Sequence, residues 1–203
     1  MAATQSEAPP TLNSPAPLSG EFVFRTPGGY LTNQAGDEIP FFEEVATRLN
    51  EARGIYETVQ PVFPVGDVFQ LVAREIPRGR YVYVFSRSPN GKLRWHFPKP
   101  SAAGGRTAGF VLEKTAEIVL QLPSPGDDWL CLLFCERAIP DMERRLYQMD
   151  ETQEDFPQAV ARVFADVLIP AHNVRFQKEQ MGFSAMADRD NIAVPLMLRV
   201  RAQ

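Results

Sequence analysis

The strictest pattern in this sequence is an alternation of apolar side chains near its C-terminus. The apolar residues at every second position are Ile192, Val194, Leu196, Leu198 and Val200. Successive side chains of a β-strand point to opposite faces of a sheet, so this spacing predicts a strand with one apolar face. Pro195 lies inside the pattern and cannot donate a ladder hydrogen bond. We therefore expect this strand to lie at a sheet edge or to carry a bulge there.

Residues 66–135 predict a series of further strands. Tyr81–Phe85 is rich in aromatic and β-branched residues, which fit a pleated, half-buried surface. The dipeptide Asn90-Gly91 is a strong hairpin signal, because both residues accept a positive φ. It is expected to join Tyr81–Phe85 to a partner strand, Leu93–Phe97, with Leu93, Trp95 and Phe97 on one face.

The segment Trp129–Cys135 is apolar at every position. Lack of alternation is typical of a central strand that is covered on both faces. Its two cysteines, Cys131 and Cys135, would then lie on the same face about 13 Å apart. A disulfide needs Cα atoms within ~7 Å, so we expect two free, buried thiols that act as small apolar side chains.

Three segments have helical spacing. The first follows Asp37 and Glu38 and is expected to end near Gly54; the second begins at Pro140 and the third at Asp155. The apolar faces of the three helices would be Phe41, Phe42, Val45, Ala46 and Leu49 in the first; Met142, Leu146 and Met149 in the second; Phe156, Val160, Val163, Phe164 and Val167 in the third.

These elements predict a mainly β fold with α additions. We expect an antiparallel β-sandwich, Ig-like in general architecture, with one helix before it and two helices inserted before the last strands. Residues 1–20 are rich in proline and predict a flexible tail. Residues 21–59 are expected to form an extension with a strand at Glu21–Thr26, a turn at Pro27-Gly28-Gly29 and the first helix. Residues 60–203 would form the sandwich domain.

Charge and hydropathy exclude several classes of partner. The formal net charge is −4 and the isoelectric point is about 5.3, whereas nucleic acids and anionic lipids require clustered Lys and Arg. No apolar run approaches the ~20 residues of a membrane span. Residues 1–19 have neither the basic nor the apolar region of a secretory signal. We expect a cytoplasmic protein, or an exported or cell-surface protein if this chain is a mature form.

The sequence contains no recognisable catalytic or metal-binding set. Its two histidines are His96 and His172, for which packing and loop roles are the simplest interpretations. The acidic pair Glu43-Glu44 fits a solvated helix face, and Asp127-Asp128 follows Pro125-Gly126, where Asp suits the geometry of a turn. Gly104-Gly105-Arg106 lacks the Lys and Ser or Thr of a phosphate-binding loop. We therefore expect a non-enzymatic protein without cofactor or metal.

Aromatic residues leave one binding function open. Tyr81, Tyr83, Trp95 and Phe97 would suit a stacking platform for single-stranded nucleic acid, but the negative charge argues against that partner. Tyr81, Tyr83 and Trp95, or the paired acids, would also suit a small-molecule or glycan site. A pocket with convergent carboxyl groups of raised pKa would support such a site.

Several segments in combination resemble a bacterial family of domains of unknown function. The segments that carry the likeness are Gly66–Phe69, Gly79–Phe85, Asn90–Leu93, His96–Pro98, Asp128–Phe134, Ile139–Asp141, Met181–Ala185 and Val194–Leu196. The family's members resemble this chain in a Gly-Tyr-hydrophobic-Tyr strand, a polar Gly-Lys hairpin and a Phe-Pro stop. They are appended to serine/threonine kinases, caspase-like peptidases and other multidomain proteins, and the likeness is greatest to Bacteroidetes-type members. The resemblance implies no activity and no site residues.

These observations favour a non-catalytic interaction or assembly module, in which the chain self-associates or binds a partner through residues 1–35. An extended strand can add to a neighbour's open edge through main-chain hydrogen bonds. The candidate interaction residues are Phe22, Val23 and Phe24 in the first strand and Pro195 in the last. The alternatives are a subunit of a filament or envelope assembly joined by N-terminal strand addition, and a small-molecule or glycan binder.

Overall fold

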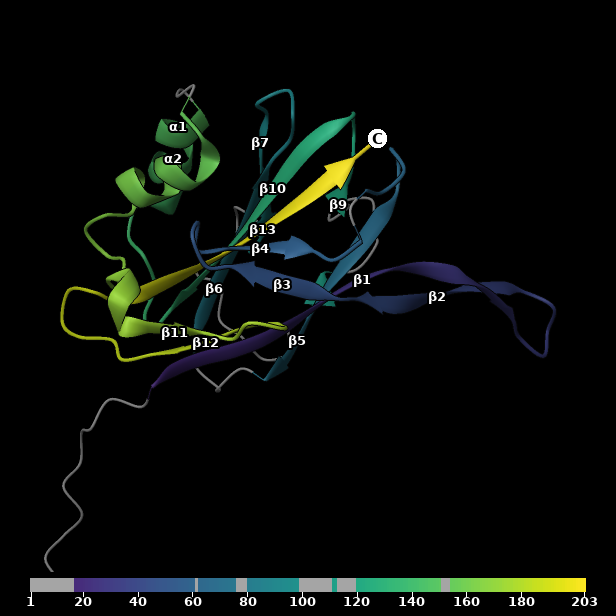
Figure 1. Ribbon diagram of the computed structural model, residues 1–203, viewed down its shortest axis with the longest axis horizontal. Helices are drawn as coiled ribbons and strands as arrows, with labels where there is room; N and C mark the ends of the chain where they lie inside the picture. The colour runs from purple at the N-terminus through teal and green to yellow at the C-terminus, as the bar shows by residue number, and fades with distance from the viewer. Residues whose placement is uncertain (1–16, 61, 76–79, 99–110, 113–119, 151–153) are drawn as a thin grey trace, which may run out of the picture.

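Two β-sheets pack face to face, and two helices lie on the outer face of one of them (Figure 1). This computed structural model describes residues 17–60, 62–75, 80–98, 111–112, 120–150 and 154–203. The expected mainly β sandwich with helical additions is confirmed. Residues 1–16 of the proline-rich segment and the Gly104-Gly105-Arg106 loop lie outside the described residues.

The first sheet has the strand order β11-β12-β1-β5-β8, with β2 paired to β1 and β9 paired to β5. Its ladders are antiparallel. Its strands are β1 (Leu18–Thr32), β2 (Glu38–Val45), β5 (Val68–Glu75), β8 (Val111–Leu112), β9 (Leu120–Gln121), β11 (Val174–Phe176) and β12 (Met181–Ala185).

The second sheet has the order β3-β4-β13-β10-β6-β7. It is antiparallel except where β13 pairs with β4 in parallel. Its strands are β3 (Thr47–Asn50), β4 (Ile55–Thr58), β6 (Tyr81–Arg87), β7 (Leu93–Phe97), β10 (Gly126–Cys135) and β13 (Ala193–Ala202).

The two helices predicted between the strands are confirmed. They are α1 (Met142–Asp150) and α2 (Phe156–Val163), and a short 3-10 helix, η1 (Ala171–Asn173), precedes β11. Met142, Leu146 and Met149 form the buried face of α1, as their spacing predicts. Pro157 lies in the first turn of α2, where its missing N–H would have no intrahelical partner.

Strand β10 separates two apolar clusters and confirms the prediction for Trp129–Cys135. Leu130, Leu132 and Phe134 face the first sheet, whereas Cys131, Leu133 and Cys135 face the helices. Both cysteines are free and fully buried, as expected. Strand β13 alternates in the same way, with Val194, Leu196, Leu198 and Val200 between the sheets.

The helix expected between Asp37 and Gly54 is wrong. That segment forms β2 and β3, and β2 pairs along its length with β1. The turn expected at Pro27-Gly28-Gly29 is also wrong, because β1 continues through these residues with a shift of register. The chain turns at Asn33–Asp37 instead, where both the side chain and the backbone of Asn33 close the loop.

Two other expectations fail for local reasons. Pro195 lies in an inner strand, and its pairing with Leu133 of β10 shows no bulge. On the other side of β13, β4 pairs only with Leu198 and Arg199, so a proline at position 195 interrupts no ladder in the described part of that side. Phe97 does not share a face with Trp95, because a shift of register between β6 and β7 turns it towards the other cluster.

Candidate functional site

A β-hairpin stands away from the sandwich at the end of the first sheet (Figure 1). We call residues 26–45 the arm; it comprises the second half of β1, the turn at Asn33–Asp37, and β2. Beyond Arg25, β1 has no partner other than β2 among the described residues. An isolated two-stranded hairpin is at best marginally stable in water, so an arm of this kind gains from a binding partner.

The arm exposes apolar side chains. Tyr30, Leu31 and Ile39 are 64%, 61% and 51% exposed and are among the most exposed large apolar residues of the described chain. Leu31 pairs with Ile39 on one face, whereas Tyr30, the next residue along β1, points to the other. Exposed apolar groups on both faces make the arm a candidate surface for protein contact.

The two ends of the arm are held by polar contacts. At the tip, the Asn33 Oδ1 accepts hydrogen bonds from the backbone N–H groups of Ala35 and Asp37 at 2.9 and 2.8 Å. At the base, the Glu44 carboxylate pairs with Arg25 at 3.2 Å and with Arg74 of β5 at 2.5 Å. These two guanidinium groups lower the pKa of Glu44. The arm is therefore fixed to the sandwich at its base and has an ordered turn at its tip.

The candidate residues Phe22, Val23 and Phe24 are placed in the first half of β1. All three are buried, and Phe24 stacks on Phe69 with ring centroids 4.7 Å apart. The backbone of this half already pairs with β12 on one side and β5 on the other. Pro195 lies on β13, in the other sheet, so the structure does not bring these residues together at one surface.

A groove of about 660 Å³ lies at the opposite end of β1 from the arm. We call it the β11–β12 groove; its lining includes Pro17, His172, Arg175, Met186 and Asp188. Met186 is 55% exposed, and Arg175 has no ion-pair partner in the described part of the chain. The Asp188 carboxylate accepts hydrogen bonds from Asn191 and from the backbone, which lower its pKa, so the groove carries one negative charge as well as the positive charge of Arg175.

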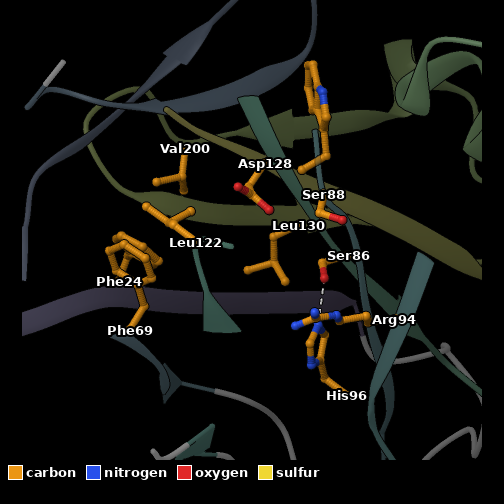
Figure 2. Close-up of a pocket in the computed structure, with 11 residues that line it drawn as sticks. Phe24, Phe69, Ser86, Ser88, Arg94, His96, Leu122, Asp128, Leu130 and Val200 are labelled. Carbon is orange, nitrogen blue, oxygen red and sulfur yellow. Dashed lines mark hydrogen bonds between the residues drawn. The ribbon is translucent and has the colours of Figure 1, made fainter. Parts of the chain in front are cut away.

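A polar pocket lies between the two sheets (Figure 2). We call it the inter-sheet pocket. Its polar side chains come from β6 and the residue that follows it, from β7 and from β10, and they are Ser86, Ser88, Arg94, His96 and Asp128. Its apolar wall includes Phe24 and Phe69, and its enclosed space is about 30 Å³, room for one or two water molecules.

Burial shapes the electrostatics of this pocket. The His96 ring is buried and its Nε2 lies 2.7 Å from the Ser86 hydroxyl; desolvation, with the nearby Arg94, lowers the pKa of His96 to about 4. Desolvation raises the pKa of Asp128 to about 7, and Asp127 adds to that rise while Arg94 opposes it. The Asp128 Oδ2 is buried and has no hydrogen-bond partner. Near neutral pH, therefore, His96 is uncharged and Asp128 is poised to gain or lose a proton.

The interpretation of Asp127-Asp128 as turn residues is wrong, because both lie in β10. Asp127 points outwards and binds Arg201 at 2.7 Å, whereas Asp128 points into the pocket. One sequence signal could have located the pocket: Ser86 and Ser88 continue the inward-facing positions of Val82 and Val84. The inner face of β6 thus changes from apolar to polar along its length.

The other candidate residues are placed in structural roles. Tyr83 and Trp95 pack in the cluster under the helices, and the Tyr83 hydroxyl accepts a hydrogen bond from the Ile139 N–H at 3.1 Å. That position does not suit an open stacking platform. His172 lies at the rim of the β11–β12 groove. Glu43 and Glu44 lie on the arm, on a strand rather than on a helix face.

The polar clusters do not form a complete catalytic or metal site in the described residues. No group of three or more His, Cys, Asp and Glu side chains there is arranged to hold a metal ion. The Ser86–His96 pair has no carboxylate bonded to its imidazole in that part of the chain, so the third member of a catalytic triad is missing. Among the described helices, none is long and apolar enough to cross a membrane.

Comparison of the chain with protein-family models, with curated proteins and with solved structures gives no match. The resemblance to the bacterial family of appended domains therefore stays a prediction. Functional inference rests on the arm, the β11–β12 groove and the inter-sheet pocket.

Proposed function

We propose that this chain is a non-catalytic assembly module in which the arm of one copy binds the β11–β12 groove of another copy. The observation that carries the proposal is the exposure of Tyr30, Leu31 and Ile39 on both faces of a two-stranded arm. Burial of such side chains releases about 25 cal/mol for each Å² of apolar surface removed from water. The partnership expected through residues 1–35 is thereby moved to the arm, residues 26–45, which shares only residues 26–35 with that expectation.

Charge favours the groove of a second copy, rather than the arm of that copy, as the surface that the arm binds. The arm contains four carboxylates, those of Asp37, Glu38, Glu43 and Glu44, and no Lys or Arg. Two arms in contact would bring like charges together, which disfavours symmetric pairing. The groove contains the cationic Arg175 together with Asp188 beside the exposed Met186, so it repels an acidic, apolar hairpin less than a second arm with four carboxylates would.

Position also favours contact between unlike ends. Strand β1 begins beside the groove, where Leu18 pairs with Ala185, and ends in the arm. Its 15 residues separate the two surfaces by roughly 45 Å. The groove is bordered by β11, which forms one end of its sheet, and β2 has β1 as its sole partner among the described residues. A contact between unlike ends of the chain generates a ring or a filament.

Light scattering after size-exclusion chromatography tests self-association. The chain of 22.8 kDa is expected to form species of several subunits at high concentration. A variant with Tyr30→Ser, Leu31→Ser and Ile39→Ser should be a monomer. Val59→Ser removes a 56% exposed apolar residue outside the arm and should leave the assembly unchanged. A wild-type chain that stays monomeric at every concentration would refute the proposal.

A mixing experiment tests the choice of partner surface. A groove variant, Arg175→Glu with Met186→Glu, should be monomeric, like the arm variant. Each variant keeps one intact surface, so an equimolar mixture should form a dimer with one copy of each. If arms bound each other, the groove variant would still self-associate and the mixture would contain no such mixed dimer.

A further inference from the structure

The inter-sheet pocket has a composition that is unusual for the space between two packed sheets. The interior of a β-sandwich is ordinarily filled by apolar side chains. Here the inner faces of β6, β7 and β10 become polar at one end, and their side chains face the same space (Figure 2). Arg94 and Asp128 are half-buried rather than fully buried, so the pocket reaches the surface at that end.

One buried oxygen atom of the pocket has no hydrogen-bond partner among the described residues, and the guanidinium group in the same lining has no ion pair with any of them. The Asp128 Oδ2 is buried without a hydrogen bond, and the Arg94 guanidinium makes no ion pair with a described residue. Arg94 and Asp128 do not form an ion pair with each other, although they face the same space. A buried oxygen without a partner is costly, so a site that keeps one is expected to satisfy it with a bound molecule.

The protonation states define the chemistry of that molecule. Below about pH 7 the Asp128 carboxyl holds a proton and becomes a hydrogen-bond donor, while Arg94 remains a cationic donor. The Ser86 hydroxyl provides a further polar contact beside the neutral His96. A pocket with these donors favours an anion, and the guanidinium disfavours a cation.

We propose that the inter-sheet pocket binds the carboxylate group of a small organic acid, with Arg94 and Asp128 as its donors and an apolar wall for the rest of the molecule. The wall is formed by Phe24 and Phe69, whose stacked rings lie across the pocket from the polar groups (Figure 2). The space of about 30 Å³ takes only a group the size of a carboxylate, so the rest of a short or flat acid would extend towards the end at which the pocket reaches the surface.

This site is independent of assembly through the arm. The pocket residues lie on the inner faces of the sandwich, whereas the arm and the β11–β12 groove are outer surfaces at the two ends of β1. Loss of self-association would therefore leave the pocket intact, and the arm variant is a suitable protein for measuring ligand binding as a monomer.

Isothermal titration calorimetry with propionate and benzoate tests the proposal. At least one acid should bind, and its neutral amide, propionamide or benzamide, should bind at least about tenfold more weakly, because a charge-assisted bond to Arg94 is lost. Propylamine and benzylamine should not bind. Equal binding of acid and amide, stronger binding of the amine, or no binding of either acid would overturn the proposal.

Variants then locate the ligand. Arg94→Gln should weaken binding of the acid about tenfold or more, whereas Arg144→Gln, on the exposed side of α1, should not change it. Thermal unfolding shows whether the Arg94→Gln variant is folded. The Arg94→Lys variant keeps the charge but loses the planar guanidinium group, so it should lose less affinity for the acid than Arg94→Gln does. Unchanged binding in both Arg94 variants would place the ligand elsewhere.

The pH dependence identifies the role of Asp128. The charged and titratable groups near it are Arg94 and His96 across the pocket and Asp127 on its own strand. His96, with a pKa of about 4, stays neutral between pH 6 and pH 8. Wild-type affinity should therefore fall about tenfold between pH 6 and pH 8 as Asp128 loses its proton. The Asp128→Asn variant keeps a hydrogen-bond donor that does not titrate, so its affinity for the acid should be the same at pH 6 and at pH 8. If the variant showed the same pH dependence as the wild type, Asp128 would be excluded as a donor.

Discussion

The two halves of β1 have the same backbone conformation and opposite environments. Residues 18–22 pair with β12, residues 21–25 pair with β5, and the side chains of Leu18, Phe22 and Phe24 are buried between the sheets. Residues 26–32 have only β2 beside them among the described residues, and they expose Tyr30 and Leu31 to solvent. A single strand thus runs from the core of the domain to a region whose apolar side chains are exposed to solvent.

This difference shows that apolar character alone does not identify a core residue. Phe22 and Phe24 contribute to folding, whereas Leu31 contributes an exposed surface that folding leaves unused. The deciding factor is the number of strands that flank each half, since a sheet of three or more strands can bury a face that a two-stranded ribbon cannot. Substitutions in the two halves should therefore affect different measurements.

The largest expected effect is that of Phe24→Ala in the buried half. The ring stacks on Phe69 and contacts Phe63 edge-on, so its removal leaves a cavity between the sheets. We expect a loss of about 3–5 kcal/mol in the free energy of unfolding, measured by urea denaturation. Leu31→Ala, the matched change in the arm, should cost less than about 0.5 kcal/mol in a monomeric background. Equal losses at the two positions would show that the arm is part of the folded core.

The next effect concerns Asp128, whose carboxyl faces the pocket that Phe24 borders. Its ordinary pKa is 3.8 and burial raises that pKa to about 7, so between these values the folded chain keeps a proton that the unfolded chain releases. The free energy of unfolding therefore falls as pH rises from about 4 to about 7. In the Asp128→Asn variant, the decrease in the free energy of unfolding over this pH range should be smaller by about 2 kcal/mol. This figure is reduced from the full effect of the pKa shift because the carboxyl is partly exposed to solvent.

His96 provides a control of opposite sign for this measurement. Its pKa falls from 6.5 to about 4 on folding, so between pH 6.5 and about pH 4 the unfolded chain binds a proton at this imidazole and the folded chain does not. Its contribution to stability is therefore lost as pH falls from 6.5 to about 4. His96→Gln should flatten stability in this acidic range. If Asp128→Asn and His96→Gln changed the pH profile in the same direction, the assignment of the two groups would be wrong.

A smaller effect is expected for Tyr56→Phe, at the point where the two sheets are tied together beside the buried half of β1. The Tyr56 hydroxyl lies 2.8 Å from the carbonyl oxygens of both Gln177 and Gly182, which share its one proton, and these residues flank the β11–β12 turn. Loss of the hydroxyl leaves these carbonyls short of a donor, at a cost of about 1.5 kcal/mol measured by thermal unfolding. The neighbouring Glu57→Gln change, at a partly exposed ion pair, should cost less. A larger loss for Glu57→Gln would reverse this ranking.

The strands and helices of the sandwich were largely predictable because each has a hydrophobic pattern that fits one kind of element. Strand β13, the doubly covered β10 and the helices α1 and α2 follow their patterns closely. The arm was not predictable in the same way. Its strand β2 has Phe41 and Phe42 on successive positions, so apolar residues fall on both faces and the segment also fits helical spacing.

The inter-sheet pocket could be predicted only in part. Ser86 and Ser88 interrupt an inward-facing series in one strand, which is a local signal. Arg94 and Asp128, by contrast, come near them only through the pairing of β6 with β7 and with β10. The bulge that turns Phe97 inwards is set by that pairing as well. Convergence of this kind depends on register, which the composition of one strand does not specify.

The smallest effect on folding is expected for Gly28→Ala, which tests the exposed half of β1 most finely. A Cβ at position 28 would lie 2.5 Å from Phe41 Cε2 and 2.5 Å from Glu43 Cγ, so both side chains must move. The flexible Glu43 can move at little cost, but Phe41 must leave its place over the Gly28-Gly29 backbone. The free energy of unfolding should change by less than about 0.5 kcal/mol, because the arm contributes little to the core.

Assembly, however, should respond to the same substitution. A displaced Phe41 alters the face that presents Leu31 and Ile39, so dissociation of the assembly, measured by light scattering across a dilution series, should occur at a severalfold higher concentration. Gln34→Ala, at the tip of the arm, is the matched control and should change neither quantity. If Gly28→Ala instead lowered stability by several kcal/mol and left assembly intact, the arm would belong to the folding unit, and the contrast between the two halves of β1 would disappear.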